Sequence, residues 1–330
     1  MKAQQLQSLD GPAGLHLVDL EPPDDPGKVV IDVRAAGVSF PELLYTYGRY
    51  QERRDPPFVP GIEVAGLVAS APEGSGFAPG DRVCACTYFG GWAERAAAEP
   101  HLTFRLPAAL DFAAGAALVV NYQTAYFCLA MRGRLAACEH LLVHGAAGGL
   151  GTAGIQVGLG LGARVIAVVS DDEKAATASA AGAHDVIVLG EHWAKEARAL
   201  TGGHGVDVVF DVVGGERFVD SLRSLAPAGR LVVAGFASGE IPEVRVNRLL
   251  MTNTEVVGAA WGAWVAAHPE TPGKIGDALD AMVGKGAIRP VVGPRFALAD
   301  APEALRTLER RAAVGKVILE LDATETRDGA

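Results

Sequence analysis

The feature that most constrains the fold is a repeat between about residues 111 and 262, in which a short apolar run is followed by a segment suited to a helix. The apolar runs predict six strands, at 140–144, 164–169, 185–189, 206–212, 230–234 and 254–257. The segments between them predict helices at 151–162, 172–181, 193–200, 217–225 and 245–251. Continuous apolar strands that alternate with helices are typical of a parallel sheet buried on both faces, and six strands complete a doubly wound dinucleotide-binding fold. We therefore predict an α/β domain with a six-stranded parallel sheet.

The first hundred residues have a different pattern, with short and often alternating apolar runs at 15–18, 29–33, 64–68 and 81–84. Turn signals separate these runs, for example Pro60 followed by Gly61. Alternation broken by Pro and Gly predicts an antiparallel, partly closed β domain.

The residues after 262 predict a helix at 275–284, a strand at 290–296, a helix that Asp300 opens and a terminal strand at 316–321. These pieces have no sheet of their own, so we expect the chain to return to the N-terminal domain. The predicted domains are therefore 1–120 with 262–330, and 121–261.

Composition narrows the class of partner. The chain has 330 residues, of which 49% are hydrophobic and 21% charged, and its formal net charge is -10. This charge disfavours nucleic acid and anionic membrane surfaces. No apolar segment follows Met1 and no run approaches the roughly 18 apolar residues that span a bilayer, so we expect a cytoplasmic protein that acts on a small molecule. The four cysteines are too few and too irregularly spaced for a disulfide framework.

A glycine-rich turn, VHGAAGGLGTAG at 143–154, follows the first strand of the repeat and precedes a helix. Glycines at such a turn let the backbone approach a pyrophosphate, whose charge then meets the free N–H groups of the helix N-terminus. We therefore predict that this turn binds a dinucleotide through Ala147, Gly148, Gly149, Leu150 and Gly151.

The end of the second strand distinguishes NADPH from NADH. An acidic residue there would bind the ribose 2′-hydroxyl and repel a 2′-phosphate. Here the strand ends in Ser170, with Lys174 one helical turn later, and both side chains suit a phosphate. This favours NADPH, whereas Asp171 and Asp172 either cap the helix or turn the site towards NADH.

The order of several motifs resembles the medium-chain dehydrogenase/reductase superfamily. These motifs lie at 37–44, 60–66, 80–83, 90–94, 121–125, 145–151 and 235–242. The closest resemblance is to the zinc-independent NADPH:quinone oxidoreductases, the zeta-crystallin-like branch. It implies a GroES-like, partly open β-barrel catalytic domain, a Rossmann domain, an active site between them, and a homodimer formed partly by edge-to-edge pairing of Rossmann sheets.

The alcohol dehydrogenases of that superfamily hold a catalytic zinc at two positions that read Ser39 and Ile62 here. An aliphatic side chain cannot ligate zinc, and serine is a poor ligand for it at neutral pH. We therefore expect an enzyme without zinc, and also without flavin. Zinc polarises the oxygen of an alcohol or carbonyl, so without it the hydride acceptor has to be electron-poor already, such as a quinone.

The resemblance also implies site residues. Tyr50 lies at the family's cleft tyrosine position and is the expected hydrogen-bond donor to the acceptor, while Tyr45, Tyr47 and Trp261 are expected to line the acceptor pocket. The nicotinamide end of the cofactor is expected to contact Ser39, Thr124, Gly235, Phe236, Ala237 and Lys316.

Two alternatives remain open at this point. An enoyl or enone reductase, acting on an α,β-unsaturated thioester, ketone or aldehyde, would use the same fold and cofactor. A non-catalytic NADPH-sensing protein would bind the nucleotide without turnover.

Overall fold

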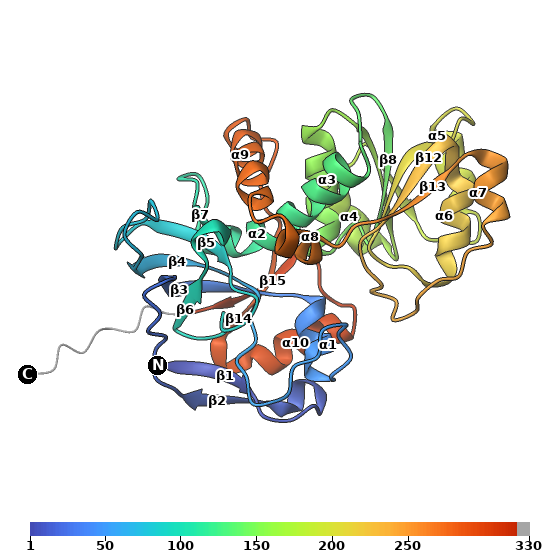
Figure 1. Cartoon of the computed structure of the whole chain (residues 1–330). Helices are drawn as coiled ribbons and strands as arrows, with labels where there is room; N and C mark the ends of the chain where they lie inside the picture. The colour runs from blue at the N-terminus through green and yellow to red at the C-terminus, as the bar shows by residue number, and fades with distance from the viewer. Residues whose placement is uncertain (322–330) are drawn as a thin grey trace, which may run out of the picture. The chain divides into compact units, whose positions relative to one another are not determined.

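The computed structural model describes residues 1–321, which fall into two compact units (Figure 1). The first unit comprises residues 1–120 and the residues from 292 onward, and the second comprises residues 121–291. The second unit is therefore one continuous stretch of chain, whereas the first is assembled from both ends.

The second unit is built on a six-stranded sheet in the order β10-β9-β8-β11-β12-β13. Its strands are β8 (His140–His144), β9 (Arg164–Val169), β10 (Asp185–Val188), β11 (Val206–Asp211), β12 (Leu225–Val233) and β13 (Glu255–Gly258). Every neighbouring pair is parallel. The predicted doubly wound parallel sheet is confirmed, although β12 begins five residues before the predicted 230, beyond a register shift against β11.

Helices connect these strands in the predicted order. They are α3 (Gly149–Gly160), α4 (Asp172–Ala180), α5 (Trp193–Leu200), α6 (Phe218–Ser224) and α7 (Asn247–Thr252). The chain moves outward from β8 in one direction through β9 and β10, and in the other through β11, β12 and β13. Because parallel crossovers are right-handed, α3 and α4 cover one face of the sheet, and α6 and α7 cover the other (Figure 1).

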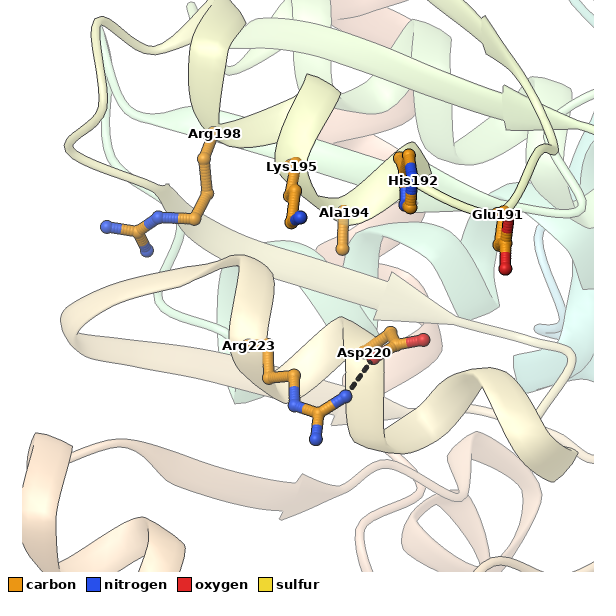
Figure 2. A pocket seen from close by; sticks show the side chains of 7 residues that line it. All are labelled: Glu191, His192, Ala194, Lys195, Arg198, Asp220 and Arg223. Carbon is orange, nitrogen blue, oxygen red and sulfur yellow. Dashed lines mark hydrogen bonds and ion pairs between the residues drawn. The ribbon is translucent and has the colours of Figure 1, made fainter.

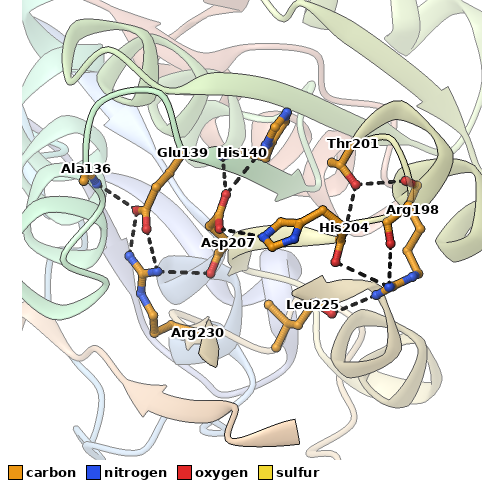
Figure 3. A network of polar contacts seen from close by, with 11 residues as sticks. Ala136, Glu139, His140, Arg198, Thr201, His204, Asp207, Leu225 and Arg230 are labelled. Carbon is orange, nitrogen blue, oxygen red and sulfur yellow. Dashed lines mark hydrogen bonds and ion pairs between the residues drawn. The ribbon is translucent and has the colours of Figure 1, made fainter. Parts of the chain in front are cut away.

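A buried ion pair ties together the amino ends of the central strands (Figure 3). The Arg230 guanidinium, 9% exposed, donates to both carboxylate oxygens of Glu139 at 2.9 and 2.8 Å. Glu139 in turn accepts the Ala136 N–H at 2.8 Å, and Asp207 accepts the His140 N–H at 2.8 Å. This network lies at the end of the sheet opposite to the glycine-rich turn, and it has a structural role.

The stretch 262–291 belongs to the second unit, which differs from its predicted place in the first domain. It contains most of α8 (Trp261–Ala267), which was not predicted, and α9 (Thr271–Gly284). Two contacts explain the placement. Met282 on α9 lies against Gly160 of α3, and the Gln156 amide exchanges two hydrogen bonds with the Arg289 backbone at 2.9 Å each.

The first unit contains a seven-stranded sheet in the order β14-β15-β3-β4-β5-β7, with β6 paired to β3. The bounds are β3 (Val29–Val38), β4 (Glu63–Ser70), β5 (Arg82–Cys86), β6 (Arg95–Ala98), β7 (Thr103–Arg105), β14 (Val292–Ala297) and β15 (Lys316–Glu320), beside a hairpin of β1 (Lys2–Leu6) and β2 (Leu15–Asp19). The register of β3 against β4 shifts twice, and such irregularities bend a sheet toward closure. The predicted GroES-like, partly open barrel is confirmed.

Two helices matter for the site in this unit. Helix α1 (Phe40–Thr46) follows β3 directly, and α10 (Ala301–Glu309) precedes β15. Strand β15 pairs antiparallel with β3, Val317 opposite Val38, so the predicted return of the chain to the N-terminal sheet is observed.

Within residues 1–321, one helical stretch is long and apolar enough to pass a simple test for a membrane span. It runs over Phe112–Arg132, through α2 (Phe112–Tyr126) and a π-helical continuation (Phe127–Arg132). About 72% of its most apolar window is buried inside the protein, which is the behaviour of a core helix in a folded domain.

Candidate functional site

The glycine-rich turn lies at the carboxyl end of β8, where the strand order of the sheet reverses between β8 and β11. Gly145 adopts a φ of 60°, and α3 begins at Gly149 with Gly148 as its N-cap. A Cβ on Gly151 would lie 2.1 Å from the Gly145 carbonyl oxygen, so no larger residue fits there. The first N–H groups of α3 have no partner within the helix and point out of this turn. The turn therefore fits the pyrophosphate of a dinucleotide.

The loops that follow β11 and β12 lie beside the turn at the same edge of the sheet. A Cβ on Gly145 would lie 3.0 Å from Val212 Cγ2, just after β11. The Ala237 N–H donates to the Val212 carbonyl at 3.1 Å, which fixes the loop containing Gly235 and Phe236. The structure thus brings this predicted cofactor loop to the glycine-rich turn. Asp211, 2% exposed, holds the β11 loop by accepting two backbone N–H bonds, from Val213 at 2.8 Å and from Gly214 at 2.9 Å.

Two other predicted residues of this unit lie on helices. Thr124 is half-buried on α2. Trp261 begins α8 and is 5% exposed, and its indole N–H has no acceptor among the residues that the structure describes. Neither has a described contact with the loop after β12, so their predicted places at the nicotinamide and acceptor sites stay predictions.

Ser170 and Lys174 lie together at the carboxyl end of β9. The Lys174 ammonium donates to the Ser170 hydroxyl oxygen at 2.9 Å. Asp171 caps α4 by accepting the Lys174 N–H at 2.9 Å, and its carboxylate also accepts from the Ser170 hydroxyl at 2.7 Å and pairs with the Lys174 ammonium at 3.0 Å. These hydrogen bonds, the Lys174 N–H first, lower the pKa of Asp171 to about 2. The predicted phosphate-binding pair exists, but a carboxylate shares both donors.

A buried cluster of charged residues surrounds Ser39 in the first unit. Lys316, 3% exposed, donates from its ammonium to Ser39 Oγ at 2.5 Å and forms an ion pair with Glu63. Glu63 is fully buried and accepts the Val120 N–H at 2.8 Å. Of the predicted cofactor-binding residues, Ser39 and Lys316 are thus in direct contact, although 277 positions separate them.

Glu42 completes this cluster and was not predicted. Its carboxyl group, 1% exposed, accepts the Ser39 N–H at 2.9 Å and the Ile62 N–H at 3.0 Å. Burial raises the pKa of Glu42 to about 7, against the opposing attraction of Lys316. The spacing of Ser39 and Glu42, a serine three residues before a glutamate, is the signature of a capping box and was a signal for this contact.

The three predicted tyrosines lie in two different places. The Tyr45 and Tyr50 rings pack at 4.5 Å, and Tyr45 also packs edge-on to Phe89. Burial, followed by the charges of Glu42 and Glu52, raises the pKa of Tyr50. Tyr47 instead donates its hydroxyl hydrogen to Glu309 on α10 at 2.6 Å and packs over Gly11, so it joins α1 to α10 and is not part of the Tyr45 cluster.

The two positions at which the alcohol dehydrogenases of the superfamily bind zinc have other contacts in this structure. The Ser39 oxygen receives a hydrogen bond from the Lys316 ammonium, and Ile62 contributes its backbone N–H to Glu42. Within residues 1–321, no three His, Cys, Asp or Glu side chains gather in a way that could hold a metal ion. The Ser39 oxygen thus faces a fixed cation, which would repel a metal ion at that oxygen.

A surface hollow lies elsewhere in the second unit, between α5 and α6 (Figure 2). Charged side chains line it, among them Lys195, Asp220 and Arg223, and Arg223 pairs with Asp220 at 2.7 Å. None of its lining residues is a predicted site residue, so it is not assigned to the cofactor or acceptor.

Comparison with known proteins defines the class. The family model of the alcohol dehydrogenase GroES-like domain matches residues 25–108, and that of the zinc-binding dehydrogenases matches residues 149–277. Quinone oxidoreductase-like protein 2 of Bos taurus is 37% identical over 303 residues, which cover 91% of this chain and 86% of that protein.

Two solved structures match nearly the whole chain. A probable oxidoreductase from Mycobacterium abscessus has a TM-score of 0.91 at 46% identity, covering 97% of this chain and 99% of the other. The quinone oxidoreductase from Thermus thermophilus has a TM-score of 0.85 at 38% identity, covering 97% and 100%. Fold and site together define an oxidoreductase with a dinucleotide-binding domain. The chain belongs to the medium-chain dehydrogenase/reductase superfamily, in its zinc-independent quinone oxidoreductase branch.

Proposed function

We propose that this protein transfers a hydride from NADPH to a quinone without a metal ion. The observation that carries the proposal is the pairing of Ser170 with Lys174 beside the glycine-rich turn, since this pair presents a hydroxyl and an ammonium at the position of the ribose 2′ substituent. The Thermus thermophilus quinone oxidoreductase has been solved as a complex with NADPH, which supports the same cofactor here.

The chain's own residues would bind and orient the cofactor. The N–H groups at the start of α3, from Gly149 to Gly151, would hold the pyrophosphate, and the loop at Gly235 would border the nicotinamide. The Lys174 ammonium and Ser170 hydroxyl would hold the 2′-phosphate. NADPH supplies a hydride from C4 of its dihydronicotinamide ring.

The acceptor class follows from the cluster at Ser39. Ser39 and Ile62 occupy the two positions at which the alcohol dehydrogenases of the superfamily bind zinc. These side chains would not hold a Lewis acid that polarises an alcohol or a simple ketone. A quinone needs no such polarisation, because its two conjugated carbonyl groups delocalise the added charge. This argument supports quinones over alcohols, and relatives named as quinone oxidoreductases support it further.

Stopped-flow oxidation of NADPH tests the proposal. The acceptors are 1,4-benzoquinone, 9,10-phenanthrenequinone and crotonyl-CoA, each at saturating NADPH. Rapid oxidation by the quinones is expected. Oxidation by crotonyl-CoA alone would identify an enoyl reductase, and tight NADPH binding with no oxidation by any acceptor would identify a nucleotide-sensing protein.

We also propose that the protein forms a homodimer along β13. This strand ends the sheet and pairs only with β12 among the described strands, so its other edge is free. Four apolar side chains close to it in sequence are strongly exposed: Ile241, Val246, Leu250 and Met251, at 71–79%. A second copy that pairs edge to edge would cover them.

A further inference from the structure

The Ser39 side-chain oxygen accepts one hydrogen bond from Lys316 and faces a second N–H group in a capping box. Lys316 Nζ lies 2.5 Å from Ser39 Oγ, and Ser39 forms a capping box with Glu42 in which the side-chain oxygen faces the Glu42 backbone N–H. A hydroxyl group has two acceptor lone pairs and one hydrogen. With both lone pairs turned to donors, the hydrogen points away from Lys316 and from Glu42.

No acceptor for this hydrogen exists among residues 1–321. Every hydrogen bond found for the Ser39 side chain brings a hydrogen to its oxygen. Ser39 is also half-buried, whereas its partners Lys316, Glu63 and Glu42 are almost completely buried. Ser39 is therefore the member of this cluster that is most accessible to a bound molecule.

The charges of the cluster favour donation from this hydroxyl. Glu63 forms an ion pair with Lys316, which offsets part of the cost of burying the ammonium group. An ammonium against a hydroxyl oxygen stabilises negative charge on that oxygen, which makes the O–H a stronger donor. Because Lys316 has little access to water, its charge is screened weakly.

We propose that Ser39 donates a proton to the reduced acceptor. In this proposal Lys316 positions the Ser39 hydroxyl group and then reprotonates it. This inference rests on the proposed quinone reduction. A quinone that has received a hydride is a hydroquinone monoanion, with both electrons already transferred. Its oxygen takes the Ser39 hydroxyl proton while the Lys316 ammonium returns a proton to Ser39 Oγ. After the product leaves, water returns a proton to Ser39 Oγ while the Ser39 hydroxyl proton passes back to Lys316, so one hydride and one proton have converted quinone to hydroquinone.

The same geometry gives Tyr50 a different role from the predicted one. Tyr50 packs on Tyr45 at 4.5 Å within the aromatic cluster, and no cation contacts its hydroxyl among the described residues. In this proposal Tyr50 shapes the aromatic wall, and Ser39 supplies the proton.

Single-turnover measurements with variants of the full chain test the assignment. Ser39→Ala removes the hydroxyl, Ser39→Thr retains both the hydroxyl and the cap, and Tyr50→Phe removes the competing hydroxyl. We expect Ser39→Ala to lower the rate of 1,4-benzoquinone reduction about 100-fold or more, and Ser39→Thr to recover most of it. A solvent deuterium isotope effect on the native protein's rate is expected if this proton transfer is rate-limiting, and it should be lost in Ser39→Ala. Loss of rate in Tyr50→Phe with retention in Ser39→Ala would overturn the proposal.

Binding measurements separate this role from a cofactor contact. NADPH dissociation constants, read from nucleotide fluorescence, should stay within about twofold in Ser39→Ala and in Lys316→Met, because this proposal assigns both residues to the acceptor in place of their expected contact with the nicotinamide. Lys316→Arg should recover more of the rate than Lys316→Met, because it retains a cation. If Lys316→Met unfolds, the pair Lys316→Met with Glu63→Gln removes both charges together. A weakening of NADPH binding that accounts for the whole loss of rate would instead place both residues at the cofactor.

The native protein distinguishes failure of this inference from failure of the proposed function. If the native protein reduces no quinone but reduces crotonyl-CoA, the proposed function fails. The rates of the Ser39 variants are then compared with crotonyl-CoA as the acceptor, where the enolate formed by hydride transfer would receive the proton. Retention of rate in Ser39→Ala on every accepted substrate overturns the inference alone.

Discussion

Asp171 and Lys174 form an ion pair of 3.0 Å at the carboxyl end of β9, and the same ammonium also contacts Ser170. The site that would receive a 2′-phosphate therefore contains its own carboxylate, which repels that phosphate and competes for its donors. Asp171 also suits the ribose 2′-hydroxyl of NADH, because a carboxylate accepts a hydrogen bond from it. We infer that this protein discriminates between NADPH and NADH less strongly than a site with Ser170 and Lys174 alone would.

Asp171→Asn is expected to tighten NADPH binding several-fold and to weaken NADH binding. Asparagine caps a helix as well as aspartate does, so α4 should remain intact. Fluorescence titration with both nucleotides gives the two dissociation constants. Equal changes for both nucleotides would contradict a role of this carboxylate at the ribose.

Lys174→Met is expected to weaken NADPH binding by about 10- to 100-fold, the typical loss of a charge-assisted hydrogen bond. NADH binding should change little, because NADH has no 2′-phosphate. The nearby helix position Glu173→Gln, on the exposed side of α4, is a matched control for a change of charge. The prediction fails if Lys174→Met weakens both nucleotides to the same extent.

Gly151→Ala is expected to destabilise the second unit even without a nucleotide, by about 1–3 kcal/mol. The added Cβ would lie 2.1 Å from the Gly145 carbonyl oxygen, and backbone at this turn cannot move away cheaply. Gly148→Ala is the control, since its Cβ would lie 3.5 Å from the same oxygen, an ordinary contact. Thermal unfolding of the two variants should differ clearly, and equal melting temperatures would show that the turn adapts.

Glu42 is expected to make stability depend on pH. Its pKa rises from 4.5 to about 7 in the folded protein, so the folded state binds more protons between these values. The protonated Glu42 carboxyl group therefore contributes about 3 kcal/mol to the free energy of unfolding below about pH 4.5. This contribution is lost as the pH rises through 7. Denaturant unfolding of the native protein and of Glu42→Gln at pH 4.5 and pH 8 measures it. The native protein should lose stability relative to the variant at the higher pH, and a constant difference would contradict the burial of a titrating carboxyl group.

Leu250→Glu combined with Met251→Glu is expected to convert the proposed dimer into a monomer, because it places charges in the apolar surface close to β13 in sequence. Val188→Glu is the control at the opposite edge strand, β10, where the side chain is 38% exposed. Light scattering after size-exclusion chromatography reports the mass of each variant. A native monomer, or a dimer lost only in Val188→Glu, would refute the assignment of this edge.

The parts of this protein that could be predicted from sequence are those set by local patterns. Continuous apolar runs identified all six strands of the parallel sheet, and the glycine-rich turn was found because glycine has a stereochemical role there. Ser170 and Lys174 were likewise one helical turn apart, so their contact followed from spacing.

The parts that could not be predicted depend on contacts between distant segments. The hydrogen bond between Ser39 and Lys316 joins residues that are 277 positions apart, and the pattern of apolar residues does not predict it. Tyr47 resembled its neighbours in sequence, yet its orientation is set by Glu309 on a helix from the other end. The assignment of α9 to the second unit depends on Met282 meeting Gly160, a fit of side-chain shape that an apolar pattern does not specify.

Strand β15 lies between β14 and β3 and so inserts the last described strand into the sheet of the first unit. A ribosome releases residues 121–291 before β15 exists, and that continuous stretch holds its complete sheet. The first unit is therefore the first to be translated, but its sheet is the last to be completed. Until then the carboxyl half of β3, which pairs with β15 from Ala35 to Val38, has an unpaired edge, whereas its amino half already pairs with β6.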